Sequence, residues 1–136
     1  ISDGWEAVRP IRFLFLLNKE TSRAFMRDND LKFIMEINQV HQNFPGGLTA
    51  IRRDVYFELG GHDERFSGWG AEDLEFLDRL QTRKLYPGEF LPAIHLWHPP
   101  AEQKQSGQRN AELLKTVLEE GPIQRIKRCR EILGDG

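Results

Sequence analysis

Gly68-Trp69-Gly70-Ala71-Glu72-Asp73-Leu74-Glu75-Phe76 is the stretch that decides the fold, together with the Pro45-Gly46-Gly47 segment that precedes it. The two segments place a glycine pair, a Trp between glycines and two adjacent carboxylates a short distance apart. A glycine pair lets a backbone approach a ligand closely, and a carboxylate beside an aromatic side chain suits a partly buried base. We expect the chemistry of the chain here.

Outward from this stretch, the pattern predicts strands that alternate with helices. The short apolar run at 11–17 is typical of a buried strand, and further strands are expected at 48–51 and 90–97. The expected helices span 21–38, 53–59, 71–84, 109–118 and the residues from 121 onward, and Gly60-Gly61 ends the second of them. This alternation predicts an α/β fold, with too few strands for a complete doubly wound sheet.

Composition narrows the class of protein. The chain has 136 residues, 39% of them hydrophobic, which fits one globular domain. A net charge of −2 provides no general attraction for nucleic acid. The longest apolar run is far shorter than the roughly 20 residues needed to span a bilayer. A single cysteine, Cys129, excludes an internal disulfide and favours a reducing compartment.

The predicted helix 71–84 carries its acids unevenly. At 100° per residue, the apolar stripe contains Leu74, Phe76, Leu77 and Leu80, and Asp73 lies near its middle with Glu72 at its edge. Glu75, Asp78 and Arg79 fall on the opposite side. Two acids in a first turn also complement the helix dipole, but that effect does not account for an acid on the apolar side. We therefore favour a functional role for Asp73.

Aromatic and histidine side chains form two further candidates. Trp69 is either a core anchor or a ring that covers a ligand from a loop hinged by glycines. His95 and His98 would point to opposite faces of a straight strand. They reach one metal ion only if the chain turns at Leu96–Trp97, which Pro99-Pro100 makes feasible.

Other polar clusters are interpreted as surface. Asp28-Asn29-Asp30 follows Arg27 inside a helical pattern and is expected to be a surface turn. His41 and His62 are expected to be solvated. The C-terminal basic residues alternate with apolar ones at helical spacing and predict a solvated helix face; they are Arg125, Lys127, Arg128 and Arg130.

Three runs of residues resemble the C-terminal catalytic segment of GT-A fold glycosyltransferases. They are Gly46-Gly47-x-x-Ala50-Ile51, Leu59-Gly60-Gly61-x-Asp63-Glu64-x-Phe66 and Gly68-Trp69-Gly70-x-Glu72-Asp73-x-Glu75-Phe76. The nearest families are the galactosyltransferase C-terminal domain, the polypeptide N-acetylgalactosaminyltransferases and bacterial family 2 enzymes. The resemblance covers about Gly46 to Pro100. It implies that residues 1–136 are the C-terminal half of a GT-A fold: one acceptor-binding, catalytic domain, and a fragment of a longer chain.

The resemblance also implies an activity. Such enzymes are metal-dependent and take a sugar from a nucleotide-diphosphate donor, here expected to be a UDP-sugar, to an acceptor hydroxyl with inversion. Asp73 would be the general base and Glu72 would orient the acceptor. The substrate-binding positions would be Gly46 and Gly47 near the donor, and Trp69 and Gly70 near the sugar. His98, with His95 as a second ligand, would bind Mn²⁺ or Mg²⁺.

One departure from the family pattern leaves alternatives open. The donor-binding half carries an Asp-x-Asp after an apolar strand, and residues 1–43 have no good candidate for that motif, so the isolated chain is expected to be poorly active or inactive. A non-catalytic carbohydrate-binding module is the first alternative, and a metal hydrolase built on His95, His98 and Asp73 is the second. The parent is expected to be a bacterial cytoplasmic or membrane-peripheral enzyme of polysaccharide biosynthesis, rather than a Golgi luminal one.

Overall fold

The computed structural model describes residues 4–29, 39–43, 48–86, 91–99 and 107–134. The chain divides into two compact units, each with a small sheet of its own. Unit 1 comprises Ile1–Arg9, Thr49–Gly88 and Ala101–Gly136, and unit 2 comprises Pro10–Leu48 and Glu89–Pro100. That the whole chain is one domain of a longer enzyme stays a prediction.

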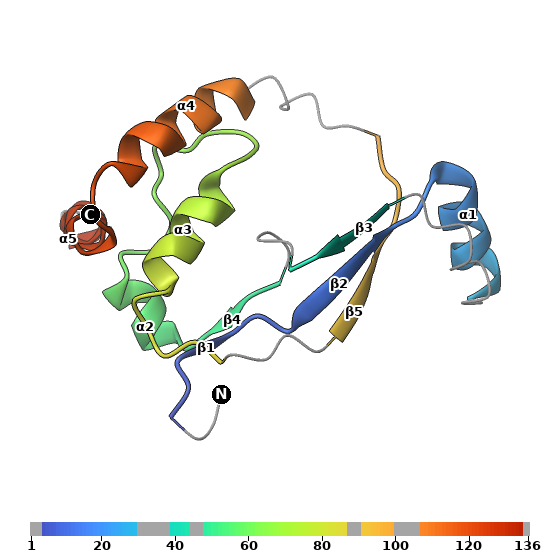
Figure 1. Cartoon of the computed structure of the whole chain (residues 1–136), viewed down its shortest axis with the longest axis horizontal. Coiled ribbons are helices and arrows are strands. Elements are labelled where there is room, and N and C mark those ends of the chain that lie inside the picture. The colour runs from blue at the N-terminus through green and yellow to red at the C-terminus, as the bar shows by residue number, and fades with distance from the viewer. Residues whose placement is uncertain (1–3, 30–38, 44–47, 87–90, 100–106, 135–136) are drawn as a thin grey trace. The chain divides into compact units, whose positions relative to one another are not determined.

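Unit 2 is built on a three-stranded sheet in the order β3-β2-β5 (Figure 1). The predicted strand at 11–17 is confirmed as β2 (Ile11–Leu16), and that at 90–97 as the shorter β5 (Leu91–His95). β5 runs parallel to β2, whereas β3 (Gln39–Gln42), which the sequence pattern did not predict, runs antiparallel. Leu16 is paired with Gln39 on one side and with His95 on the other, so these three residues lie at the same end of the sheet.

Helix α1 (Lys19–Asp28) follows β2 and is shorter than the predicted helix 21–38. It begins at Asn18, whose side chain accepts a hydrogen bond of 2.7 Å from the Thr21 backbone N–H. It ends at Asn29, whose positive φ of 48° is a left-handed C-terminal cap. The surface turn predicted at Asp28-Asn29 is therefore confirmed, and residues 30–38 lie outside the described residues.

Unit 1 opens with a small antiparallel ladder between β1 (Ala7–Val8) and β4 (Ala50–Ile51). The second of these confirms the strand predicted at 48–51, with closer limits. Helix α2 (Arg53–Glu58) follows and ends at Gly60-Gly61 as predicted, because both glycines adopt positive φ. A Cβ on Gly60 would stand only 2.5 Å from Cys129 Cβ, so the missing side chain lets the C-terminal helix approach.

Three further helices complete unit 1: α3 (Glu72–Leu80), α4 (Gly107–Leu118) and α5 (Pro122–Gly134). α3 packs against both α4 and α5, and α5 also contacts α2 (Figure 1). The apolar core beneath them consists of Ala7, Val55, Leu59, Phe76 and Leu80. The described residues thus form a mixed α/β structure with small sheets and flanking helices. The predicted fold class is confirmed, and the arrangement is consistent with part of a GT-A fold.

Candidate functional site

The turn that leads into α3 holds the two predicted catalytic acids. Gly68 and Gly70 have φ of 82° and 99°, and Ala71, the N-cap, has φ of 75°. A left-handed conformation costs a residue with a Cβ roughly 1–2 kcal/mol, and such strain is concentrated at functional sites. Glu72 and Asp73 follow directly in the first turn of the helix.

Asp73 does not face the core, contrary to the prediction from helical spacing. Its side chain is exposed, and Leu74 on the predicted apolar stripe is 44% exposed. The buried face of α3 instead carries Glu75 and Arg79, both fully buried, beside Phe76 and Leu80. Hydrophobicity alone predicted the wrong buried face of α3, because the two charged residues are stabilised in the interior by ion pairs and not by apolar contacts.

The electrostatic surroundings of Asp73 nevertheless favour proton uptake. Partial burial of the carboxyl, and then the neighbouring charge of Glu72, raise the pKa of Asp73 above its ordinary value, while His62 acts in the opposite direction. Among the described residues, no Lys or Arg forms a salt bridge with Asp73. Glu72 is half-buried, and its Oε2 is buried without a hydrogen-bond partner in the described structure.

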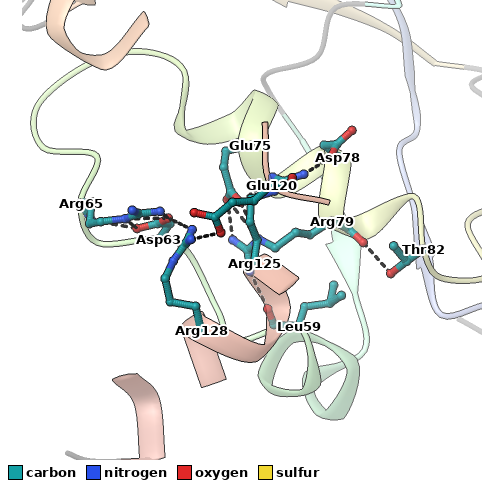
Figure 2. A network of polar contacts seen from close by, with 10 residues as sticks. All are labelled: Leu59, Asp63, Arg65, Glu75, Asp78, Arg79, Thr82, Glu120, Arg125 and Arg128. Carbon is teal, nitrogen blue, oxygen red and sulfur yellow. Dashed lines mark hydrogen bonds and ion pairs between the residues drawn. The ribbon is translucent and has the colours of Figure 1, made fainter. Parts of the chain in front are cut away.

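A charge network surrounds Glu75 of α3 (Figure 2). It consists of four carboxylates and four guanidinium groups, from Asp63, Glu75, Asp78, Glu120, Arg65, Arg79, Arg125 and Arg128. Arg125 is fully buried and Arg128 half-buried, so the predicted solvated face of the C-terminal helix is wrong for these two residues. A buried guanidinium is tolerated here because carboxylates and carbonyls accept its hydrogen bonds.

Asp63 is the first carboxylate of the network that follows α2 in the sequence. Burial by itself raises the pKa of Asp63, but hydrogen bonds from Arg65 and the charges of Arg65 and Arg128 outweigh it, and the net pKa is lowered. Arg65 Nη2 lies 2.7 Å from Asp63 Oδ2, and Arg128 Nη2 lies 3.4 Å from the same atom. The Asp63 carboxylate is therefore kept ionised, and its oxygens are engaged by the two guanidinium groups.

Trp69 lies on a loop that α4 fastens. The amide Nδ2 of Asn110, a fully buried residue, donates hydrogen bonds of 3.1 Å to the backbone carbonyls of Ser67 and Trp69. A Cβ on Gly107 would touch the Trp69 ring at 3.5 Å, so the indole rests on the start of α4. Trp69 is 51% exposed, on a backbone that these hydrogen bonds fix. Asn110 was missed from the sequence, since no local signal links it to residue 69.

The predicted metal ligands lie where β5 ends. The strand stops at His95, and the chain then turns, so the ring centroids of His95 and His98 come within 5.2 Å. This is the turn at Leu96–Trp97 that a metal site shared by the two rings requires. Leu17 donates its N–H to the His95 carbonyl, and Trp97 donates its N–H to Ser22 Oγ, which together hold the turn against α1.

A pocket of about 470 Å³ lies at the same sheet edge. Its lining includes Asn18, Lys19, Glu20, Gln39 and Trp97, and the Lys19 ammonium stands 5.0 Å from the centroid of the Trp97 ring. Within the described ranges, no group of three or more His, Cys, Asp or Glu side chains is arranged to hold a metal ion. Two imidazoles fit part of a transition-metal ligand set.

The remaining predicted positions are divided between the units and the rest of the chain. Gly46 and Gly47 lie outside the described residues, so their proposed approach to the donor stays a prediction. Gly70, Trp69, Glu72 and Asp73 come together in unit 1. His95 and His98 belong to unit 2.

Comparison with known proteins finds similarity to glycosyltransferases. The chain is 41% identical over 56 residues to "Probable N-acetylgalactosaminyltransferase 9" of Caenorhabditis elegans, covering 39% of this chain and 9% of that protein. It is 26% identical over 78 residues to human "Beta-1,4-galactosyltransferase 4", covering 57% and 23% of the two chains. It is 32% identical over 72 residues to "N-acetylgalactosaminyltransferase 6" of Drosophila melanogaster, covering 52% and 11%. No solved structure matches.

A family model also matches the central part of the chain. The model described as the N-terminal domain of galactosyltransferase matches residues 35–95, a range that includes every predicted site residue except His98. The centre of the chain is therefore similar to glycosyltransferase sequence, and the expected resemblance to galactosyl- and N-acetylgalactosaminyltransferases is confirmed. The match spans less than a quarter of the length of each relative. The placement of this segment in the C-terminal portion of its parent stays a prediction.

The relatives correct one expectation. The bacterial cytoplasmic assignment is wrong, because the matching proteins come from a nematode, an insect and a human. The lone cysteine was a poor indicator of source, since a single free thiol is compatible with many compartments. Among the helices that the structure describes, none combines the length and apolar character needed to cross a membrane.

Proposed function

We propose that the protein containing this chain transfers a sugar from a nucleotide-diphosphate donor to an acceptor hydroxyl, with inversion at the anomeric carbon. Asp73 is the general base. The observation that carries this proposal is the state of Asp73: an exposed acid in the first turn of α3, with a raised pKa and no salt bridge to a described Lys or Arg. The match to transferases over residues 35–95 supports the reaction class.

The proposed step is a single displacement. The acceptor oxygen attacks the anomeric carbon, its O–H proton passes to the Asp73 carboxylate, and the bond to the diphosphate breaks as the new glycosidic bond forms. A raised pKa suits this role, because a base whose proton affinity is closer to the working pH takes the proton more effectively. Glu72, the neighbouring acid in the same turn, is proposed to orient the acceptor.

We further propose that His98 and His95 contribute two ligands to a divalent cation, which when bound neutralises the departing diphosphate. Imidazole ligands favour Mn²⁺ over Mg²⁺, which prefers oxygen ligands. The pocket at the end of β2 and β5 supports donor binding at this end of the sheet, since ligands of such sheets bind beyond the carboxyl ends of parallel strands. A UDP-sugar is the donor to test first.

The test is calorimetry and a transfer assay on the full protein, with a panel of nucleotide sugars and Mn²⁺. The proposal expects Mn²⁺-dependent donor binding that His98→Ala abolishes. It also expects Asp73→Asn to retain donor binding and lose transfer by roughly a hundredfold or more. The matched control is Asp54→Asn, an exposed first-turn acid of α2 that pairs with Arg52 instead. Full transfer by Asp73→Asn would exclude this residue as the base.

A carbohydrate-binding module is the second candidate, and the exposed Trp69 ring on its fastened loop favours it. An aromatic face packs well against a sugar ring without any chemistry. Sugar binding that survives Asp73→Asn, in a parent protein that transfers nothing from any nucleotide sugar, would establish this reading and displace the transferase.

A further inference from the structure

Arg125 reaches from α5 to the underside of α3 and occupies all of its guanidinium nitrogens (Figure 2). Nη1 donates to Glu75 Oε1 at 2.8 Å, Nη2 pairs with Asp78, and Nε donates to the Glu120 backbone carbonyl at 3.1 Å. Arg125 is fully buried, and its contact with Glu75 is buried on both sides. One side chain thus joins α3, the residues after α4, and α5.

Glu75 is the partner that transmits this contact to the acidic turn. Its carboxylate also accepts from Arg79, with Nη2 at 2.6 Å from Oε2 and Nε at 2.8 Å from Oε1. Arg79 in turn donates to the Leu59 carbonyl at the end of α2. The Glu75 N–H donates to the Ala71 carbonyl at 3.1 Å, which closes the first turn of α3 around Glu72 and Asp73.

We propose that Arg125 is a positioning residue for the proton transfer carried out by Asp73, an inference that rests on the function proposed above. Arg125 fixes Glu75, Glu75 belongs to the turn that carries Asp73, and the turn sets the distance from the carboxylate to the acceptor hydroxyl. Small displacements of a reacting group cost large factors in rate, on the order of a hundredfold for 1 Å. Arg125 lies outside the segment shared with the transferase family model, residues 35–95.

The geometry of the contacts, beyond their charge, carries this role. A guanidinium is a planar fork that serves three acceptors in fixed directions, whereas an ammonium group on a flexible stem does not reproduce that fork. Arg125→Lys therefore keeps the positive charge beside Glu75 and removes the simultaneous contacts to Asp78 and Glu120. The matched control is Arg130→Lys, the same change at an exposed position of the same helix.

The experiment measures kcat, KM for the donor and hydrogen exchange of the Glu75 amide in the full protein. Arg125→Lys is expected to lower kcat by about tenfold or more, with the donor KM within about twofold of wild type. Exchange at Glu75 is expected to accelerate, while amides of α2 keep their rates. Arg130→Lys is expected to match the wild type in every measurement.

Wild-type kcat in Arg125→Lys would overturn the inference, as would a loss that disappears once rates are corrected for the folded fraction. The exchange measurement needs no substrate and so separates the two proposals. A wild-type protein that transfers no sugar refutes the proposed function. An unchanged Glu75 exchange rate in Arg125→Lys refutes the positioning role by itself.

Discussion

Two acidic regions of unit 1 differ in the partners they give a carboxylate. In the charge network, Asp63 and Glu75 are buried and each is paired with two guanidinium groups. In the first turn of α3, Asp73 and Glu72 form no salt bridge to a described residue. The pKa of Asp63 is lowered and that of Asp73 is raised. Paired acids hold the helices in place, whereas the two acids of the turn are not committed to a salt bridge with a described residue.

The largest expected effect comes from removing a paired acid. Glu75→Gln removes the carboxylate that the buried Arg79 and Arg125 share, and leaves only Arg125 with a second carboxylate, Asp78; breaking a buried ion pair costs about 3–5 kcal/mol. Urea unfolding of the variant measures this loss. The control is Glu131→Gln at an exposed position of α5, expected within about 0.5 kcal/mol of wild type. A loss below about 1 kcal/mol for Glu75→Gln would erase the contrast between the two regions.

A second variant tests the seating of α5, which supplies Arg125 and Arg128. Gly60→Ala places a Cβ 2.8 Å from the Arg130 backbone nitrogen at a φ of 84°, so overlap and backbone strain together should cost about 2–3 kcal/mol. Gly121→Ala is the control, since no atom lies within 4 Å of its added Cβ. Thermal unfolding compares the two. Equal melting temperatures would show that α5 moves to accommodate the added methyl group without any loss of stability.

The third variant addresses the loop beside the unpaired acids. Asn110→Ala removes two hydrogen bonds to the carbonyls of Ser67 and Trp69, and should lower stability by about 1–2 kcal/mol. Acceptor KM should rise with it, because Trp69 loses its fixed backbone. Gln108→Ala, on the exposed side of α4, is the control. An unchanged acceptor KM in Asn110→Ala would separate Trp69 from acceptor binding.

Asp63 predicts a pH dependence with a definite sign. Its folded pKa is lowered, so its contribution is fully present above its unfolded pKa, near 3.8, and is lost as pH falls through the lower folded value. Asp63→Asn should therefore cost about 1 kcal/mol at neutral pH and progressively less toward about pH 2. Urea unfolding across that range gives the difference, and a gap that widens on acidification would contradict the assignment.

The smallest effect on stability, and the opposite sign, is expected for Asp73→Asn. Because the folded pKa of Asp73 is raised, its charged form weakens the fold at neutral pH, and stability from this group returns only as pH falls. The variant should melt at the wild-type temperature or slightly above it. A melting temperature several degrees lower would place Asp73 with the structural acids.

Much of the fold was predictable because its signals are local. The apolar run of β2 and the Gly60-Gly61 stop each act within a few residues. The buried face of α3 was not predictable, since its partners are distant in the sequence. Glu75 pairs with Arg125, 50 residues away, and Arg79 bonds the Leu59 carbonyl, 20 residues away. The spacing of four between Glu75 and Arg79 was the one local hint of that pair.

The candidate site divides in the same way. The motif of glycines, Trp69 and two acids identified the turn at α3, and Pro99-Pro100 indicated the turn that brings the histidine rings together. The orientation of Asp73 was misjudged, because it follows from which neighbours the network buries. Asn110 is invisible to any motif, since it acts on backbone carbonyls more than 40 residues away.

The separation of Glu75 from Arg125 also has a consequence for biosynthesis. A ribosome makes the chain from its N-terminus, so α3 emerges well before the helix that neutralises it. Until Arg125 has been synthesised and has docked, Glu75 has only Arg79 as a buried partner and Asp78 has none of the network's guanidinium groups. The first turn of α3 is thus expected to reach its final conformation only after α5 has folded against it.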